Sequence, residues 1–345
     1  MNLNDFNPNG VGVDNGSYFG LPSSVEESRV VIVSAPWDVT VSYGAGTAFA
    51  PDAIIEASTQ LDLYDPSAPD AWRAGIATAA VDYSIQELSQ SLRKDAVRII
   101  DHLEDGGAIG DFLISRKLKR VNDGSVRLNQ KIYDQTSKLL QQGKIVGLVG
   151  GDHSTPYGLI KAVGEVFTEF GILHIDAHCD LRVAYEGFDF SHASIMHNVL
   201  RDVEQVTKIV EVGVRDFCDE ELAVAESSPR IEMFSDFALS RERFTGATWA
   251  SQCQRIVDAL PQKVYVSFDI DGLSMNCCPH TGTPVPGGMS FNEAVYLLEK
   301  IVESGRQIIS FDVVEVTPSP NERIDAIVGA RILYKLCGMS IMSNR

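Results

Sequence analysis

Three polar side chains alternate along the stretch ILHIDAHCDLR, directly after an apolar run. Asp176, His178 and Asp180 occupy every second position, and in an extended chain such positions point to the same side. Two carboxylates and an imidazole that converge on one point can ligate a cation. The stretch therefore predicts a metal site at the end of a strand.

Two other strand-like runs end in the same kind of residue. VGLVGGDHSTP delivers His153, and VSFDIDG delivers Asp269 and Asp271. Buried carboxylates are unfavourable unless a cation pairs with them, so four aspartates in a small volume require metal. Four carboxylates and two neutral imidazoles match two divalent ions, an arrangement that activates water for hydrolysis. Oxygen-rich ligands without a thiolate favour Mn²⁺ over zinc, with Ni²⁺, cobalt and iron as alternatives.

The elements that position these residues are short, continuous apolar runs, the pattern of a parallel sheet covered on both faces. Helix-length segments lie between the runs, and the one at 290–305 begins with the capping-box residues Ser290 and Glu293. The alternation predicts one doubly wound α/β domain over 1–345, with a polar N-terminal arm at 1–28 and an excursion at about 104–135. In such a sheet, ligands bind beyond the carboxyl ends of the strands. The predicted strands are 29–36, 144–151, 170–178, 208–216, 230–235, 263–271 and 308–316.

The composition limits the possible partners. The net charge of −18 argues against nucleic acid and anionic membranes, which need a basic surface, and suits a small cationic substrate. The six cysteines form no C-x-x-C pair, which indicates reduced thiols in a cytosolic enzyme. The N-terminus has no signal-peptide pattern, and no apolar run reaches the ~20 residues of a membrane span. We therefore expect a cytoplasmic protein.

The motifs GGDHS, DAHCD, SFDIDGL and DVVEVTP resemble, in order and spacing, the signature blocks of the ureohydrolase family, which includes arginase, agmatinase, guanidinobutyrase and formimidoylglutamase. The resemblance implies a three-layer α/β/α fold with a mostly parallel central sheet of about eight strands, two Mn²⁺ per chain, and a homotrimer or homohexamer. By match to the motifs, one ion would be held by His153, Asp176, Asp180 and Asp269, and the other by Asp176, His178, Asp269 and Asp271.

The resemblance also implies roles for other residues. Glu315 falls where the family keeps a carboxylate that pairs with the substrate guanidinium, and a planar guanidinium does take a carboxylate bidentately. His192 corresponds to the proton-shuttle histidine, with His197 as a nearby competitor. Asp216 sits where arginases place an acid near the substrate amine. The implied reaction is hydrolysis of a guanidino compound to urea and an amine.

The stretch LRVAYEGFDF (181–190) resembles the loop of agmatinase-like members, because the Asn and Ser run with which arginases bind the substrate carboxylate is absent. Glu186 or Asp189 is expected to meet a cationic tail, which favours agmatine, hydrolysed to putrescine and urea.

Two alternative substrate classes stay open. Trp37 and Tyr43 would narrow the pocket for free guanidine. Arg182 would instead hold the carboxylate of a guanidino acid such as guanidinobutyrate, arginine or formimidoylglutamate. A single-zinc deacetylase-like hydrolase and a non-catalytic family member are remote alternatives, since all six ligands are present.

Overall fold

One parallel sheet of eight strands organises residues 3–345, the part of the chain that the computed structural model describes. The strand order is β2-β1-β3-β8-β7-β4-β5-β6, and every neighbouring pair is parallel. The predicted fold class is therefore confirmed. The strands are β1 (Val30–Ser34), β2 (Ile76–Thr78), β3 (Ile145–Val149), β4 (Phe170–Ile175), β5 (Val206–Val212), β6 (Ile231–Phe234), β7 (Lys263–Asp269) and β8 (Gln307–Val314).

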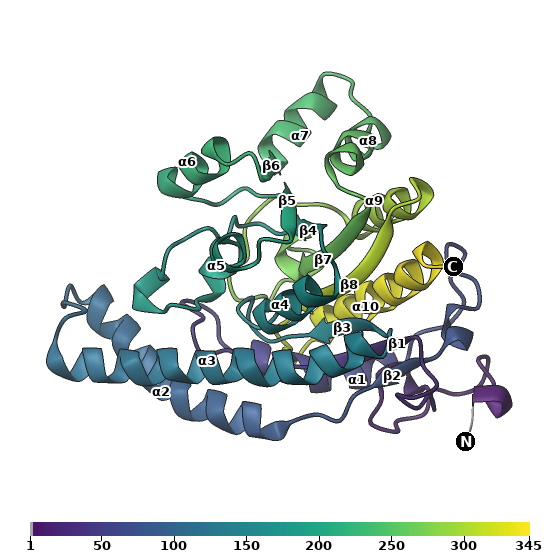
Figure 1. Ribbon diagram of the computed structural model, residues 1–345, viewed down its shortest axis with the longest axis horizontal. Coiled ribbons are helices and arrows are strands. Elements are labelled where there is room, and N and C mark those ends of the chain that lie inside the picture. The colour runs from purple at the N-terminus through teal and green to yellow at the C-terminus, as the bar shows by residue number, and fades with distance from the viewer. Residues whose placement is uncertain (1–2) are drawn as a thin grey trace.

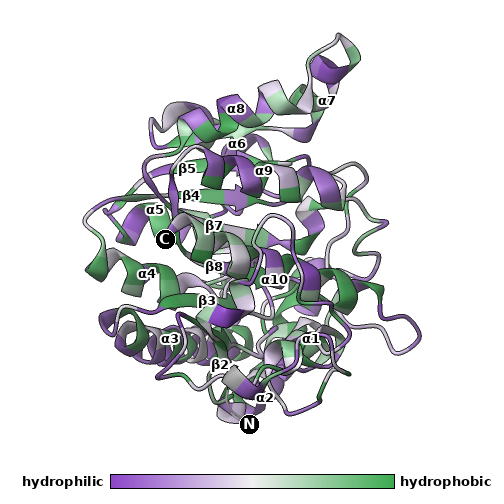
Figure 2. Ribbon diagram, turned by 90° about the vertical axis from the view of Figure 1, so that its right-hand side faces the viewer, coloured by the Kyte–Doolittle hydropathy of each residue, from purple (hydrophilic) through white to green (hydrophobic). Residues whose placement is uncertain are grey.

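Helices cover both faces of the sheet and complete the three layers (Figures 1 and 2). One buried core joins the sheet to α1, α8, α9 and α10, and the other joins it to α2, α3, α4 and α5. The helices are α1 (Ala50–Ser58), α2 (Tyr83–Glu104), α3 (Phe112–Gln141), α4 (Tyr157–Val166), α5 (Ile195–Asp202), α6 (Asp219–Ser227), α7 (Asp236–Phe244), α8 (Trp249–Ala259), α9 (Phe291–Glu303) and α10 (Ile324–Ser343).

Each of the seven predicted strands is present, and the expected capping box opens α9 at Ser290 and Glu293. The sequence missed β2, an edge strand of three residues that pairs only with β1. A strand of three residues is too short to produce a recognisable hydrophobic pattern.

The segment 104–135 contains most of α3, which lies beside α2 in a long antiparallel pair (Figure 1). One face of α3 buries Val121, Leu128 and Ile132 in the same core as α4, while its other face is charged. The N-terminal stretch 1–28 buries Tyr18 and Phe19 against α1 and α10; residues 1 and 2 lie outside the described part.

Helix α10 is long and apolar enough to cross a membrane, but 72% of its most apolar window is buried inside the protein. It packs against β8, α1 and α9. A helix that is apolar on all sides and packed in this way belongs to the core of a domain. Within residues 3–345 the six cysteines are all unpaired.

The four central strands place the functional residues. β3, β8, β7 and β4 are consecutive neighbours in the sheet and all run in the same direction. Their carboxyl ends therefore lie at one edge, and the residues that follow them in sequence meet there. His153, Glu315, Asp269 and Asp176 each come at or just after the end of one of these strands.

Candidate metal centre and active site

His153 lies at the centre of one group of carboxylates. Its Nδ1 atom is 2.9 Å from Asp176 Oδ2, 3.0 Å from Asp180 Oδ2 and 3.2 Å from Asp269 Oδ2. Nδ1 is buried, yet it forms no hydrogen bond of acceptable geometry with any of them. A nitrogen that faces three carboxylate oxygens without bonding to one has the position of a metal ligand.

The other ring nitrogen of His153 fixes the tautomer. Nε2 is 3.0 Å from the hydroxyl of Ser267, and that hydroxyl donates to Asp312 at 3.2 Å. Because the Ser267 hydroxyl donates to Asp312, it accepts from Nε2–H, which leaves the lone pair of Nδ1 directed at the carboxylates. Outer hydrogen bonds of this kind orient ligating histidines.

His178 forms a second group that shares Asp176 with the first. Its Nδ1 atom lies 3.3 Å from Asp176 Oδ1 and 3.3 Å from Asp271 Oδ2. Asp271 Oδ2 is buried and has no hydrogen-bond partner. Two overlapping sets of ligand atoms are compact enough to hold an ion: one comprises His153, His174, Asp176 and Asp180, and the other comprises Asp176, His178 and Asp271.

Backbone amides hold the carboxylates in place. The His178 N–H donates to Asp176 Oδ1 at 2.6 Å, and the Ala177 N–H donates to Asp271 Oδ1 at 3.0 Å. The Asp271 N–H donates to Asp269 Oδ1 at 2.8 Å. The second oxygens of Asp269 and Asp271 remain directed at the imidazoles. Buried carboxylate oxygens that are held in place in this way are suitable ligands for divalent cations.

The charge balance of the buried acids leads to the same conclusion. Burial, together with Asp271 and Asp176, raises the pKa of Asp269 well above its ordinary value. Burial also opposes ionisation of Asp176, but the neighbouring imidazoles hold the pKa of that carboxyl well below its usual range. Buried carboxylates that repel one another favour protonation. They stay ionised together only if positive charge is added, and bound cations supply it.

Glu315 is held beside this cluster in a strained backbone conformation. Its φ is 60°, its N–H donates to Gly151 O at 2.8 Å, and its carbonyl accepts from the Thr281 hydroxyl at 2.8 Å. Its Oε1 accepts the His153 backbone N–H at 2.8 Å, and burial with nearby Asp152 raises the pKa of the carboxyl well above its ordinary value. Strain of this kind concentrates at functional positions.

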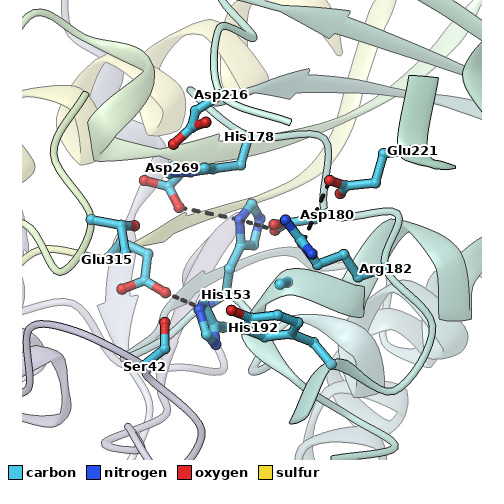
Figure 3. Close-up of a pocket in the computed structure, with 13 residues that line it drawn as sticks. Ser42, His153, His178, Asp180, Arg182, His192, Asp216, Glu221, Asp269 and Glu315 are labelled. Atoms are coloured by element: carbon cyan, nitrogen blue, oxygen red, sulfur yellow. Dashed lines mark hydrogen bonds and ion pairs between the residues drawn. The ribbon is translucent and has the colours of Figure 1, made fainter. Parts of the chain in front are cut away.

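One cavity of about 130 Å³ joins these groups, and Figure 3 shows Glu315, Asp269 and His178 lying around it. Asp176 and Asp271 lie fully buried behind its wall. The cavity is lined by Ser42, His153, His178, Asp180, Arg182, Tyr185, His192, Ala193, Asp216, Glu221, Asp269, Thr283 and Glu315.

His192 lines the cavity, whereas its competitor His197 does not. The His192 backbone N–H donates to the Thr40 hydroxyl at 3.0 Å. Burial, with the nearby His178 imidazole, lowers the pKa of His192 to about 3, so the ring is neutral near pH 7. His197 instead lies on α5, where its backbone N–H donates to the carbonyl of Asp180 at 3.2 Å.

The structure divides the predicted contacts to the substrate tail. Arg182 and Asp216 line the cavity, but Glu186 and Asp189 do not. Glu186 lies in a left-handed turn with φ 56°, and Asp189 is exposed to solvent. The turn at 184–187 directs the side chain of Tyr185, rather than that of Glu186, to the cavity.

The two aromatic residues expected at the pocket edge are absent from the cavity lining. Trp37 is completely buried in the core, where its carbonyl accepts the Asp152 N–H at 2.8 Å. Tyr43 is 84% exposed. Trp37 therefore packs in the core beside Asp152 and not in the cavity wall.

The sequence reasoning missed several residues around the site. His174 lies fully buried with Nε2 2.9 Å from Asp176 Oδ2, and its place in the same alternation as Asp176 was an available signal. Glu221 lines the cavity and accepts the Leu181 N–H at 3.1 Å. It is the third residue of α6, so the acidic start of that helix was its only signal. Ser42 and Thr283 come from loops and had none.

Comparisons with known proteins agree with this geometry. The family model described as the arginase family matches residues 28–338. An agmatinase of Bacillus anthracis is 30% identical over 295 residues, which cover 86% of each chain. An N(1)-aminopropylagmatine ureohydrolase of Thermus thermophilus is 27% identical over 315 residues, 91% of each chain. The protein belongs to the arginase family.

A solved structure supports the fold. The agmatine ureohydrolase of Thermoplasma volcanium superposes with a TM-score of 0.70 at 21% identity, covering 93% of this chain and 92% of its own. At that identity the likeness establishes the architecture and no more.

Glu186 makes the stability of this region depend on pH. Burial, with Glu104 nearby, raises its pKa from 4.5 to about 7. The folded chain therefore keeps a proton that the unfolded chain loses, and this stabilisation is complete below pH 4.5 and disappears as the pH rises through 7. Glu186→Gln keeps a neutral side chain, so its free energy of unfolding relative to wild type should increase from pH 4.5 to 7 and then level off. Urea denaturation at four pH values measures it; parallel curves would contradict the assignment.

Proposed function

We propose that this protein is a metal-dependent hydrolase that cleaves a guanidino compound into urea and an amine. The observation that carries the proposal is the position of Glu315, whose Oε1 accepts the backbone N–H of the metal-ligand candidate His153 at 2.8 Å inside the same cavity. A carboxylate takes a planar guanidinium bidentately, and here it would hold that group against the metal centre. The names of the relatives in the arginase family support the same reaction.

The two ligand groups support a centre of two divalent ions, and the oxygen-rich donor set favours Mn²⁺, with Ni²⁺ as the alternative. Two such ions, when bound, supply the Lewis acidity that activates water for attack on the guanidinium carbon. Asp176 would help to hold the ions, because one of its oxygens faces His153 and the other faces His178. Asp269, whose second oxygen faces His153, would contribute to the same centre.

The chain's own residues then position the substrate and move the proton. Glu315 binds the guanidinium through its carboxylate. The positive charge of the guanidinium in turn stabilises the ionised form of this buried carboxylate. His192 lies in the cavity wall, where its ring would relay a proton from water to the departing nitrogen. The Thr40 hydroxyl holds the backbone of His192 and so fixes the origin of that side chain.

Agmatine is the proposed substrate, and Asp216 is the acid in the cavity lining that would receive its ammonium group. A second candidate class is a guanidino acid. Arg182 favours this class, because it lines the cavity and its ion-pair partner among the described residues, Glu221, is 3.5 Å away. Figure 3 shows Arg182 directed toward Glu221 at the side of the cavity.

We further propose a homotrimer or homohexamer that acts in the cytoplasm. The usual assembly of the family supports the oligomer, and the six unpaired cysteines within residues 3–345 suit a reducing compartment. Native mass spectrometry of the metal-loaded protein gives the number of chains directly.

The metal proposal predicts that wild-type protein binds two ions per chain and releases urea from agmatine. Mn²⁺ at about a hundred times its dissociation constant should stabilise it by about 2.7 kcal/mol. Asp176→Ala removes the ligand that both groups share, so it should abolish this stabilisation and the activity together. Asp189→Ala, an exposed acid outside the cavity, is the control. Thermal unfolding measures the stabilisation, urea release measures the activity, and elemental analysis counts the ions; a single zinc per chain in active protein would overturn the two-ion centre.

His192→Asn tests proton transfer separately from metal binding. The variant should lose about 10²–10⁴-fold in kcat, the usual contribution of a general acid or base, while its metal content stays at the wild-type level. His197→Asn should keep nearly full activity because His197 does not line the cavity. Near-normal turnover in His192→Asn would assign the proton transfer to another group.

The tail of the substrate can be tested with two reciprocal variants. Asp216→Asn should raise KM for agmatine roughly ten- to a hundredfold with a smaller change in kcat, since a charge-assisted contact is made in both the ground state and the transition state. Arg182→Ala should leave KM for agmatine unchanged. If instead agmatine is inert and Arg182→Ala raises KM for 4-guanidinobutyrate, the guanidino acid is the substrate.

A further inference from the structure

The loop that follows the metal ligand Asp180 is strained at its centre. Ala184 and Glu186 adopt φ values of 45° and 56°, and Gly187 follows at 83°. Left-handed backbone is unfavourable for residues other than glycine, and it persists only where the surroundings impose it. This loop, residues 181–190, also carries Arg182 and Tyr185 into the cavity wall. Whatever holds the loop therefore also shapes the part of the cavity beyond the metal ligands.

Asn122 of α3 holds the loop on both sides of its strained turn. Its side-chain Nδ2 donates to the carbonyl of Gly187 at 3.1 Å, and its Oδ1 accepts the N–H of Asp189 at 3.1 Å. One side-chain amide thus bonds both a donor and an acceptor of the loop backbone. An ionised carboxylate only accepts hydrogen bonds, so it could not make both contacts. The two bonds span the buried Phe188, which anchors the same stretch in the core.

The tip of the α2–α3 pair packs on the same turn. A Cβ added to Gly187 would lie 2.2 Å from Ile109 Cδ1 and 3.0 Å from Leu118 Cδ2. The loop thus contacts the tip and α3 with no room for a side chain at this position.

The held turn places Tyr185 between two residues of the site. The guanidinium carbon of Arg182 lies 4.7 Å from the centre of the Tyr185 ring, and the His192 ring centre lies 6.4 Å from it in an edge-to-face arrangement. A shift of the turn would therefore move Tyr185, release Arg182, and leave the metal ligands on the strand ends where they are.

We propose that Asn122 is a positioning residue that sets the substrate-tail side of the cavity by fixing the 181–190 loop, and that the α2–α3 pair serves the active site through this contact. The role in substrate selection rests on the proposed function, whereas the fixing of the loop does not. Asn122 touches no reacting atom, so it acts only through Tyr185 and Arg182.

Hydrogen exchange of the metal-loaded protein tests the fixing directly. Asn122→Ala removes both bonds and should speed exchange of the 182–190 amides by about tenfold, with no change in peptides that contain the metal ligands. Asn122→Asp keeps the acceptor for the Asp189 N–H and loses the donor, so it should give an intermediate rate. Gln130→Ala, at an exposed position on the same helix whose side-chain amide donates to Asp134, is the matched control. Unchanged exchange at 182–190 in Asn122→Ala would overturn the proposal, whether or not a substrate has been identified.

Kinetics with agmatine and 4-guanidinobutyrate test the role in selection. Asn122→Ala should raise KM for the compound that is turned over by about tenfold, with kcat within about twofold of wild type and unchanged metal content. In a Tyr185→Ala background the same change should have little further effect, because the two act through one turn. A fall in kcat with loss of metal would instead show a general structural role and refute selection. Faster loop exchange without turnover of any guanidino compound would refute the proposed function and leave the fixing of the loop established.

Discussion

Negative charge gathered at the carboxyl ends of four neighbouring strands is the constraint on which the rest of the site depends. Because β3, β8, β7 and β4 are parallel and adjacent, the residues that follow them lie close together at one edge of the sheet. The backbone amides of Ala177, His178 and Asp271 hold these carboxylates without neutralising them. The arrangement is electrostatically complete only with cations, and the same unmet demand for positive charge extends to Glu315.

The neighbourhood of Glu315 shows how the fold positions acidic residues that lie beyond the ends of the strands. Glu315 and Asp180 both have left-handed backbone, with φ values of 60° and 54°; Glu315 directly follows β8, and Asp180 lies in the loop five residues after the end of β4. Glu315 is held at its N–H by Gly151 and at its carbonyl by Thr281. The carbonyl of Asp180 accepts from two amides of α5. Backbone hydrogen bonds thus replace the strand ladder where the strand has ended.

The sequence was most informative where chemistry and secondary structure coincide. Asp176, His178 and Asp180 alternate at a strand end, so their type and their orientation could be inferred together, and seven buried strands were long enough to show continuous apolar runs. Trp37 could not be placed, because an aromatic residue after a strand packs equally well in a core or at a pocket edge. Glu186 and Asp189 were assigned by charge alone, but the left-handed turn that directs Tyr185 inward has no simple sequence signal outside Gly187.

The difference between the residues that could be placed from the sequence and those that could not has a physical cause. The same cause bears on how the substrate specificity of such an enzyme can change. The candidate metal ligands His153, Asp176 and Asp269, and the candidate guanidinium ligand Glu315, lie at or just after strand ends, whose positions are set by sheet register and by packing in two cores. Arg182, Tyr185 and Asp216, which line another part of the cavity, come from loops. Loops on a rigid scaffold can vary without disturbing the scaffold. The reaction class can therefore be inferred from the residues at the strand ends, whereas selectivity, as proposed above, would depend on contacts between segments far apart in the sequence, such as that of Asn122 on α3 with the 181–190 loop.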